Sequence, residues 1–182
     1  MSWKLKKTVA LVGMMGAGKT AVGKALAARL EVPFLDSDAE IETAANMSVA
    51  EIFSRDGEPF FRDKESQVIQ RLLETECCIL STGGGAYMAA PNRQMISDKG
   101  VAVWLNADLN LLWQRVRHKD TRPLLRTENP LAVLTDLFNK RVPVYGLADL
   151  QIHVEPGCSI EETATMVIDV LLTRPDVLEK VE

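Results

Sequence analysis

The chain has 182 residues, of which 47% are hydrophobic and 25% charged, and its 21 basic and 25 acidic side chains leave a net charge of −4. This length and composition are typical of one globular domain, and the acidic balance argues against a general nucleic-acid or anionic-membrane binder. Three cysteines without a CxxC spacing, and two histidines far from them, argue against a disulfide framework and a zinc site.

Short apolar runs alternate with longer segments of helical periodicity along the chain. The predicted strands are residues 8–12, 33–36, 78–81, 101–106 and 149–154. The predicted helices are residues 19–30, 49–56, 58–74, 91–99, 107–117, 130–145 and 159–173. Strands that alternate with helices in this way predict an α/β fold, with a parallel sheet covered by helices.

Two stretches depart from simple alternation within the single domain that we expect over residues 1–182. Residues 38–74 place two or three helices between the second and third predicted strands, more than a crossover needs, and such an excess is typical of a substrate-binding excursion. Residues 118–129 are polar and carry Arg122, a composition that suits a mobile lid. An ordinary surface loop would look similar.

Residues 13–20 read Gly-Met-Met-Gly-Ala-Gly-Lys-Thr and match the pattern GxxxxGK[ST] at every fixed position, between an apolar strand and an amphipathic helix. The glycines let backbone N–H groups turn toward a phosphate without steric clashes. Lys19 is expected to reach the β- and γ-phosphates, and the Thr20 hydroxyl to bind Mg²⁺. We therefore predict a nucleoside triphosphate site, for ATP with Mg²⁺, rather than a flexible glycine-rich turn.

Two aspartates, Asp36 and Asp38, close the second predicted strand. Residues two apart on a strand project the same way, about 6.5 Å apart. Both carboxylates would then face the carboxyl edge of the sheet, where doubly wound folds place ligands, one near Mg²⁺ and the other near a substrate hydroxyl. An equally weighted alternative is that Asp38 only caps a helix that begins at Ala39.

Arginines and a glycine triplet complete the candidate site. Arg62 and Glu65 lie three apart on one helix face, a spacing that a surface ion pair would also explain. Three glycines at 83–85 follow the third predicted strand and indicate that something approaches the backbone closely. Arg122 and Arg141 come later, and several arginines in an acidic chain that binds a polyanion favour a binding role.

Taken in order, these motifs resemble those of shikimate kinases, and the likeness extends over about residues 8–173. The motifs are the phosphate loop, Asp36-Ser-Asp38, Phe61-Arg62 with Glu65, the glycine triplet, Arg122-Pro-Leu-Leu and Arg141-x-Pro-x-Tyr145. The phosphate loop alone is shared by many nucleotide-binding families, whereas the ordered set is far more specific. The resemblance implies a three-layer P-loop kinase fold, with a five-stranded parallel sheet in the order 2-3-1-4-5 and helices on both faces.

The resemblance also implies an activity, namely ATP-dependent phosphorylation of the 3-hydroxyl of shikimate, a step toward chorismate and the aromatic amino acids. It implies catalytic roles for Asp38 as the proposed base, Lys19 and Arg122. It implies ATP binding by Gly13, Gly16, Ala17, Gly18, Lys19, Thr20, Ala21, Arg115 and Arg122. It implies shikimate binding by Asp38, Arg62, Gly83, Gly84, Gly85 and Arg141, and a Mg²⁺ site at Thr20 and, through water, Asp36.

Within this resemblance, Arg115 is expected against the adenine, Arg122 over the phosphates, and Arg62 and Arg141 on the substrate carboxylate. The chain departs from the family where Ala21 replaces a common hydroxyl residue, and where residues 154–157 lack an arginine that some members place near the adenine.

Three other functions compete with this interpretation. Another small-molecule kinase of the same architecture, such as a gluconate kinase, would share the phosphate loop but not the spaced arginines with the glycine triplet. A GTPase switch would carry an NKxD guanine reader, and the Asn139-Lys140 pair lacks its aspartate. Intact Lys19 and Asp38 argue against a kinase-like module without activity.

The expected partners are ATP and shikimate, with no nucleic acid and no membrane, and the expected state is a monomer. We expect a cytoplasmic protein, because residues 1–7 are too short and polar for a signal peptide and no apolar run is long enough for a membrane helix.

Overall fold

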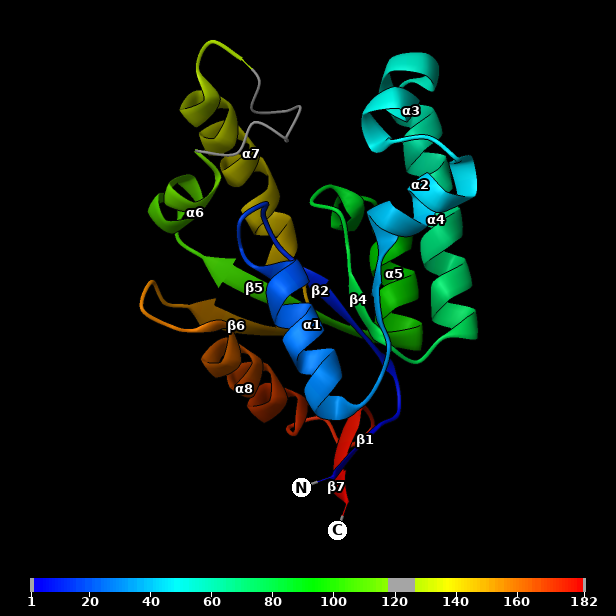
Figure 1. Cartoon of the computed structure of the whole chain (residues 1–182), viewed down its shortest axis with the longest axis vertical. Helices are drawn as coiled ribbons and strands as arrows, with labels where there is room; N and C mark the ends of the chain where they lie inside the picture. The colour runs from blue at the N-terminus through cyan, green and yellow to red at the C-terminus, as the bar shows by residue number, and fades with distance from the viewer. Residues whose placement is uncertain (1, 118–126, 182) are drawn as a thin grey trace.

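Five parallel strands form the central sheet of the computed structural model, which describes residues 2–117 and 127–181 (Figure 1). In sheet order the strands are β3 (Phe34–Asp36), β4 (Ile79–Ser81), β2 (Thr8–Val12), β5 (Gly100–Ala107) and β6 (Leu150–Val154). Val9 of the central strand lies opposite Ile79 on one side and Val101 on the other. The five predicted strands correspond to β2 to β6. When they are numbered 1 to 5 along the chain, the sheet order is 2-3-1-4-5, which confirms the predicted fold class.

Helices connect the strands and cover the sheet (Figure 1). They are α1 (Lys19–Leu30), α2 (Ser37–Ala45), α3 (Val49–Asp56), α4 (Glu58–Thr75), α5 (Ala90–Lys99), α6 (Leu109–Val116), α7 (Pro130–Tyr145) and α8 (Ile160–Leu171), with a 3₁₀ turn, η1, at Ala86–Met88. Every residue from Val101 to Leu105 of β5 is buried, so both faces of the sheet are covered. Of the helices in the described ranges, none is long and apolar enough to cross a membrane.

Three of the predicted helices begin and end at the predicted residues, and the ends of α4, α5, α6 and α8 differ by one or two residues. The predictions for α1, α3 and α7 agree with the structure at both ends. At Ser48 the side chain accepts a hydrogen bond from the N–H of Glu51, which fixes the start of α3. The helix predicted over 107–117 is shorter as α6, because β5 continues its pairing with β6 as far as Ala107.

The buried side chains form two hydrophobic clusters that meet at β4. The main cluster surrounds β2 and β5 and includes Ile79. A second cluster holds Ile41, Ile52 and Phe61 of α2, α3 and α4 together with Cys78 and Leu80. Successive strand residues point to opposite faces, so Ile79 packs in the main cluster while Cys78 and Leu80 pack in the second. The segment containing β4 thus lies between the two clusters. The helices α2 to α4 therefore have a small core of their own.

A two-stranded antiparallel sheet that the sequence analysis did not predict lies beside the main fold. It pairs β1 (Ser2–Leu5) with β7 (Leu178–Val181), in a register that sets Ser2 opposite Val181 and Leu5 opposite Leu178. The N–H of Lys6 extends this pairing by donating to the carbonyl of Val177 at 2.7 Å. Figure 1 shows both ends of the chain at this sheet, away from α2, α3 and α7.

We expect Gly23→Ala to destabilise the fold by about 1–3 kcal/mol, because it overpacks a close contact between α1 and β3. A Cβ atom at Gly23 would lie 2.6 Å from Cε1 of Phe34 and 3.3 Å from Cδ1 of Leu11. Chemical denaturation measures the change in the free energy of unfolding. Gly157→Ala is the matched control, because a Cβ at Gly157 would meet nothing within 4 Å. Equal stabilities of the two variants would contradict the prediction.

Candidate active site

The phosphate loop joins the end of β2 to the start of α1, as the motif requires. Its glycines adopt backbone conformations that other residues rarely take, with φ values of 146° at Gly13, 85° at Gly16 and 99° at Gly18. Lys19 folds back over the loop and its Nζ donates to the carbonyl of Gly13. Thr20 is exposed in the first turn of α1. The helix N-terminus and the backbone N–H groups thus form a site suited to phosphate.

Arg115 of α6 lies beside this loop. Its Nη1 donates to the carbonyl of Gly16 at 3.0 Å and lies 3.7 Å from the position of a Cβ built on Gly18. A Cβ at Gly16 would lie 2.8 Å from Cγ1 of Val116, so α6 packs closely on the loop. The guanidinium therefore lies against the phosphate loop, and its contact with the adenine stays a prediction.

The two aspartates at the end of β3 are placed differently from either prediction. The strand ends at Asp36, whose Oδ1 accepts a hydrogen bond from the N–H of Ala39 at 3.1 Å and so caps α2. Asp38 lies in the first turn of α2. The prediction that both aspartates project from one strand is wrong, and so is the alternative in which Asp38 is the cap. The extended backbone of Asp36 lets its short side chain reach the free N–H group.

Asp38 nevertheless has the environment of a functional carboxylate. Burial raises its pKa and the nearby charge of Asp36 raises it further, while Lys19 and Arg62 act in the opposite direction. Among the described residues, its Oδ1 is buried and accepts no hydrogen bond. Because buried polar atoms are normally paired, this oxygen is suited to accept a hydrogen bond from a bound ligand.

Each glycine of the triplet lies against one of three predicted substrate residues. A Cβ at Gly83 would lie 2.7 Å from Oδ1 of Asp38, and one at Gly84 would lie 2.8 Å from Nη1 of Arg141. A Cβ at Gly85 would collide with the guanidinium of Arg62. Any larger residue at these positions would displace one of the three side chains, which come from α2, α7 and α4, from its place against the backbone.

Neighbouring side chains hold the triplet in place. The N–H of Gly83 donates to Oγ of Ser37 at 3.1 Å, and the hydroxyl of Tyr145 donates to the carbonyl of Gly84. Burial raises the pKa of Tyr145 to about 12, so its hydroxyl keeps the proton that it donates. No role was predicted for Ser37 or Tyr145. For Tyr145 the sequence held one signal: it follows Arg141 by four residues, which places both side chains on the same face of one helix.

The ion pair between Arg62 and Glu65 is not a surface pair. Nη1 of Arg62 lies 2.9 Å from Oε1 of Glu65, whose side chain is 1% exposed. Burial raises the pKa of Glu65, and the charge of Arg62 opposes the shift. Arg141 is also buried, at 8% exposed, and within the described parts of the chain no carboxylate forms an ion pair with it. A buried cation of this kind favours an anionic ligand.

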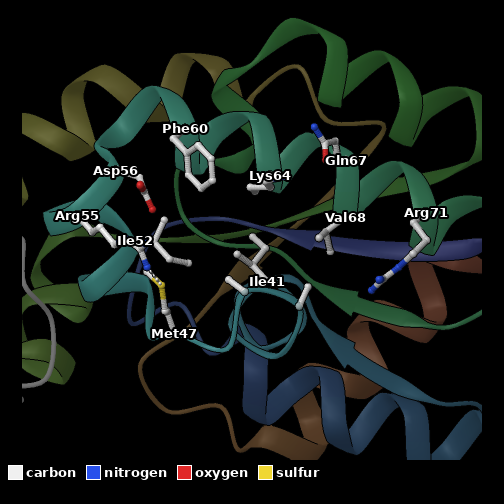
Figure 2. Close-up of a pocket in the computed structure, with 12 residues that line it drawn as sticks. Ile41, Met47, Ile52, Arg55, Asp56, Phe60, Lys64, Gln67, Val68 and Arg71 are labelled. Carbon is white, nitrogen blue, oxygen red and sulfur yellow. Dashed lines mark hydrogen bonds between the residues drawn. The ribbon is translucent and has the colours of Figure 1, made fainter.

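A cavity of about 490 Å³ between α2, α3 and α4 is separate from this group of residues (Figure 2). Ile41, Ile52 and Phe60 project into it, and Asp38, Arg62 and Arg141 do not line it. Its cationic side chains have other partners. Arg71 pairs with Glu40, Arg55 contacts the sulfur of Met47, and Lys64 lies over the ring of Phe60. The cavity is therefore not the predicted acceptor site.

The predicted Mg²⁺ ligands fit a magnesium site that is completed by the nucleotide. Asp36 keeps one oxygen beyond its cap, and the Thr20 side chain is exposed at the phosphate loop. Within the described ranges no group of three or more histidine, cysteine or acidic side chains is arranged to hold a metal. Mg²⁺ commonly relies on one or two protein groups, phosphate oxygens and waters.

The predicted lid cannot be compared in the same way, because Arg122 and the rest of residues 118–126 lie outside the described residues.

Comparisons with known proteins agree with this geometry. The family model for shikimate kinase matches residues 15–172. A shikimate kinase of Ruegeria pomeroyi is 66% identical over 175 residues, which cover 96% of this chain and 90% of the relative. A shikimate kinase of Acinetobacter baumannii, solved in complex with shikimate, superposes with a TM-score of 0.86 at 38% identity and covers 92% of this chain and 93% of its own.

A gluconokinase of Sinorhizobium meliloti shares the fold alone, with a TM-score of 0.60 at 16% identity over 93% of this chain and 94% of its own. By contrast, the match to the family model and the 66% identical relative span nearly the whole chain. The chain belongs to the shikimate kinase family.

Proposed function

We propose that the protein transfers the γ-phosphoryl group of ATP to the 3-hydroxyl of shikimate, giving shikimate 3-phosphate and ADP. The observation that carries this proposal is the row of three side chains along the glycine triplet. One end presents the carboxylate of Asp38, and the other presents the guanidinium groups of Arg62 and Arg141. This arrangement suits a small ligand with a hydroxyl group at one end and a carboxylate at the other.

The proposed mechanism divides the work between the two halves of the site. Arg62 and Arg141 bind the carboxylate and fix the ring, which positions the hydroxyl for in-line attack. Asp38 orients that hydroxyl and accepts its proton late in the transfer. Lys19 and Arg122 stabilise the charge on the transferred group. Thr20, and Asp36 through water, would hold Mg²⁺, which when bound would neutralise part of the phosphate charge.

An ADP-release assay with purified protein tests the proposed function. With ATP and Mg²⁺ present, shikimate should stimulate ADP release and gluconate should not. Lys19→Ala is the control for a contaminating kinase, because it removes the cation that we assign to the phosphates. Stimulation by gluconate alone would instead favour the small-molecule kinase alternative, which so far rests on a shared fold.

We expect Gly84→Ala to raise the KM for shikimate by about tenfold or more, because the added Cβ displaces the Arg141 guanidinium from its position. The clash of 2.8 Å involves the end of a flexible side chain, so the fold can accommodate it at little cost in stability. Steady-state kinetics at saturating ATP measure the effect, with Gly157→Ala as the neutral control. An unchanged KM for shikimate would show that Arg141 does not bind the substrate from this position.

The pH dependence of catalysis should follow the raised pKa of Asp38. Since the base must be ionised to accept a proton, kcat/KM for shikimate should fall as the pH decreases through this pKa. Burial places that fall at a higher pH than the ordinary value of about 3.9 for an aspartate. A pH profile, with circular dichroism to confirm folding at each pH, measures it. Constant activity down to the ordinary aspartate range would contradict the prediction.

A further inference from the structure

Side chains of α5 hold the backbone that follows the glycine triplet. The Nδ2 of Asn92 donates to the carbonyl of Ala86 at 2.9 Å. The Nη1 of Arg93 donates to the carbonyls of Tyr87 and Met88, at 2.8 and 3.0 Å. Three successive carbonyl groups of η1 are thus bound by two adjacent residues of one helix. The turn that begins at Gly85 is therefore fixed relative to α5.

The other end of the Asn92 amide is bound to α4. The hydroxyl of Ser66 donates to Oδ1 of Asn92 at 2.7 Å. Ser66 follows Arg62 by four residues, so the two side chains lie on the same face of α4. Asn92 is 0% exposed, and its amide group joins the helix that carries Arg62 to the loop that carries Gly85. The bond to Ala86 is buried and the bond to Ser66 is partly buried, so water competes weakly for the Asn92 amide.

We propose that Asn92 is a positioning residue for the acceptor site, which sets the place of the Arg62 guanidinium relative to the glycine triplet. The guanidinium packs on Gly85 so closely that a Cβ there would collide with it. A small shift of α4 away from the loop would therefore move the guanidinium relative to the ligand. The two hydrogen bonds of Asn92 oppose this shift. The inference rests on the proposed function, because it takes Arg62 to be a shikimate ligand.

The chemistry of the amide explains why asparagine suits this place. It must accept a proton from the hydroxyl of Ser66 and donate one to the carbonyl of Ala86 at the same time. An aspartate would lack the donor, and a leucine of similar size would lack both groups. Asn92→Leu thus removes the coupling while it largely preserves the packed volume. Ser66→Ala removes only the bond to α4, and Ser66→Thr keeps it.

Steady-state kinetics of Asn92→Leu, Ser66→Ala and Ser66→Thr test the proposal. We expect Ser66→Ala, which loses one hydrogen bond, to raise the KM for shikimate by about three- to tenfold, and Asn92→Leu, which loses both, to raise it at least as much. The KM for ATP should stay unchanged, because the phosphate loop is on another element. Ser66→Thr should restore the parent KM. If Asn92→Leu fails to fold, the comparison of Ser66→Ala with Ser66→Thr gives the same test.

A double-mutant cycle separates a positioning role from a structural one. The effect of Ser66→Ala on the KM for shikimate should largely disappear in an Arg62→Lys background and persist in an Arg141→Lys background. Equal effects in both backgrounds, or equal changes in the KM values for shikimate and ATP, would overturn the inference. If the parent protein does not phosphorylate shikimate, the proposed function fails. If it does and Ser66→Ala behaves like the parent, only this inference fails.

Discussion

Asp38→Asn should lower the kcat for shikimate phosphorylation by about 10²- to 10⁴-fold, the range typical of a lost general base. The asparagine keeps the size of the side chain but cannot accept the proton of the attacking hydroxyl. The unpartnered Oδ1 of Asp38 is the oxygen that we assign to this task. Rapid-quench or coupled assays at saturating ATP and shikimate measure the change.

The stability of the same variant should move in the opposite direction. Because the folded-state pKa of Asp38 is raised, its stabilising contribution is present below the ordinary aspartate pKa and is lost as the pH rises through the raised value. At neutral pH the ionised carboxylate therefore destabilises the fold, and Asp38→Asn should unfold at the same or a higher denaturant concentration. For catalysis, a kcat of Asp38→Asn within a few-fold of the parent value would show that Asp38 only orients the substrate.

Arg141→Ala should raise the KM for shikimate by about 30-fold or more, as expected when about 2 kcal/mol or more of a buried charged contact is lost. The guanidinium is 8% exposed and lies against Gly84, where water competes weakly for a bound carboxylate. Isothermal titration with shikimate measures the same loss as a weaker Kd. The KM for ATP should change little, because Arg141 is on α7 and the phosphate loop precedes α1.

Arg141→Lys distinguishes the charge from its geometry. Lysine keeps the positive charge but cannot form the paired contacts of a guanidinium with a carboxylate. Affinity for shikimate should therefore recover only in part. If Arg141→Ala bound shikimate as tightly as the parent, the carboxylate would have to be bound elsewhere, and the proposed orientation of the substrate would be wrong.

Local chemistry made much of the fold predictable from the sequence. Periodic apolar residues and a capping serine at 48 gave helix ends that agree with the structure, as in α1 and α3. The phosphate loop carries its own structural requirements, because only glycine tolerates its positive φ values. The strand order, by contrast, is a matter of long-range pairing and was available only through the resemblance to a family.

Two features were not predicted correctly from the sequence. At the start of α2 several residues could cap the helix, and the β1–β7 sheet depends on pairing between distant segments. Asp36, Ser37 and Asp38 each have side chains suited to capping, and the extended backbone at Asp36 decides which of them begins α2. The pairing of β1 with β7 joins residues 173 to 179 positions apart, so neither segment signals it alone. The match of each glycine at 83–85 to one side chain likewise depends on three separate helices.

The second hydrophobic cluster has a consequence for how such a protein can evolve. Ile41, Ile52 and Phe61 pack mainly among themselves and against the β4 segment, apart from the cluster around β2 and β5. Substitutions in α2 or α3 therefore leave the packing beneath the phosphate loop largely intact, whereas α4 also places Ile69 and Leu73 in the main cluster. Acceptor specificity can therefore change during evolution through such substitutions, while the packing that supports the ATP site is retained.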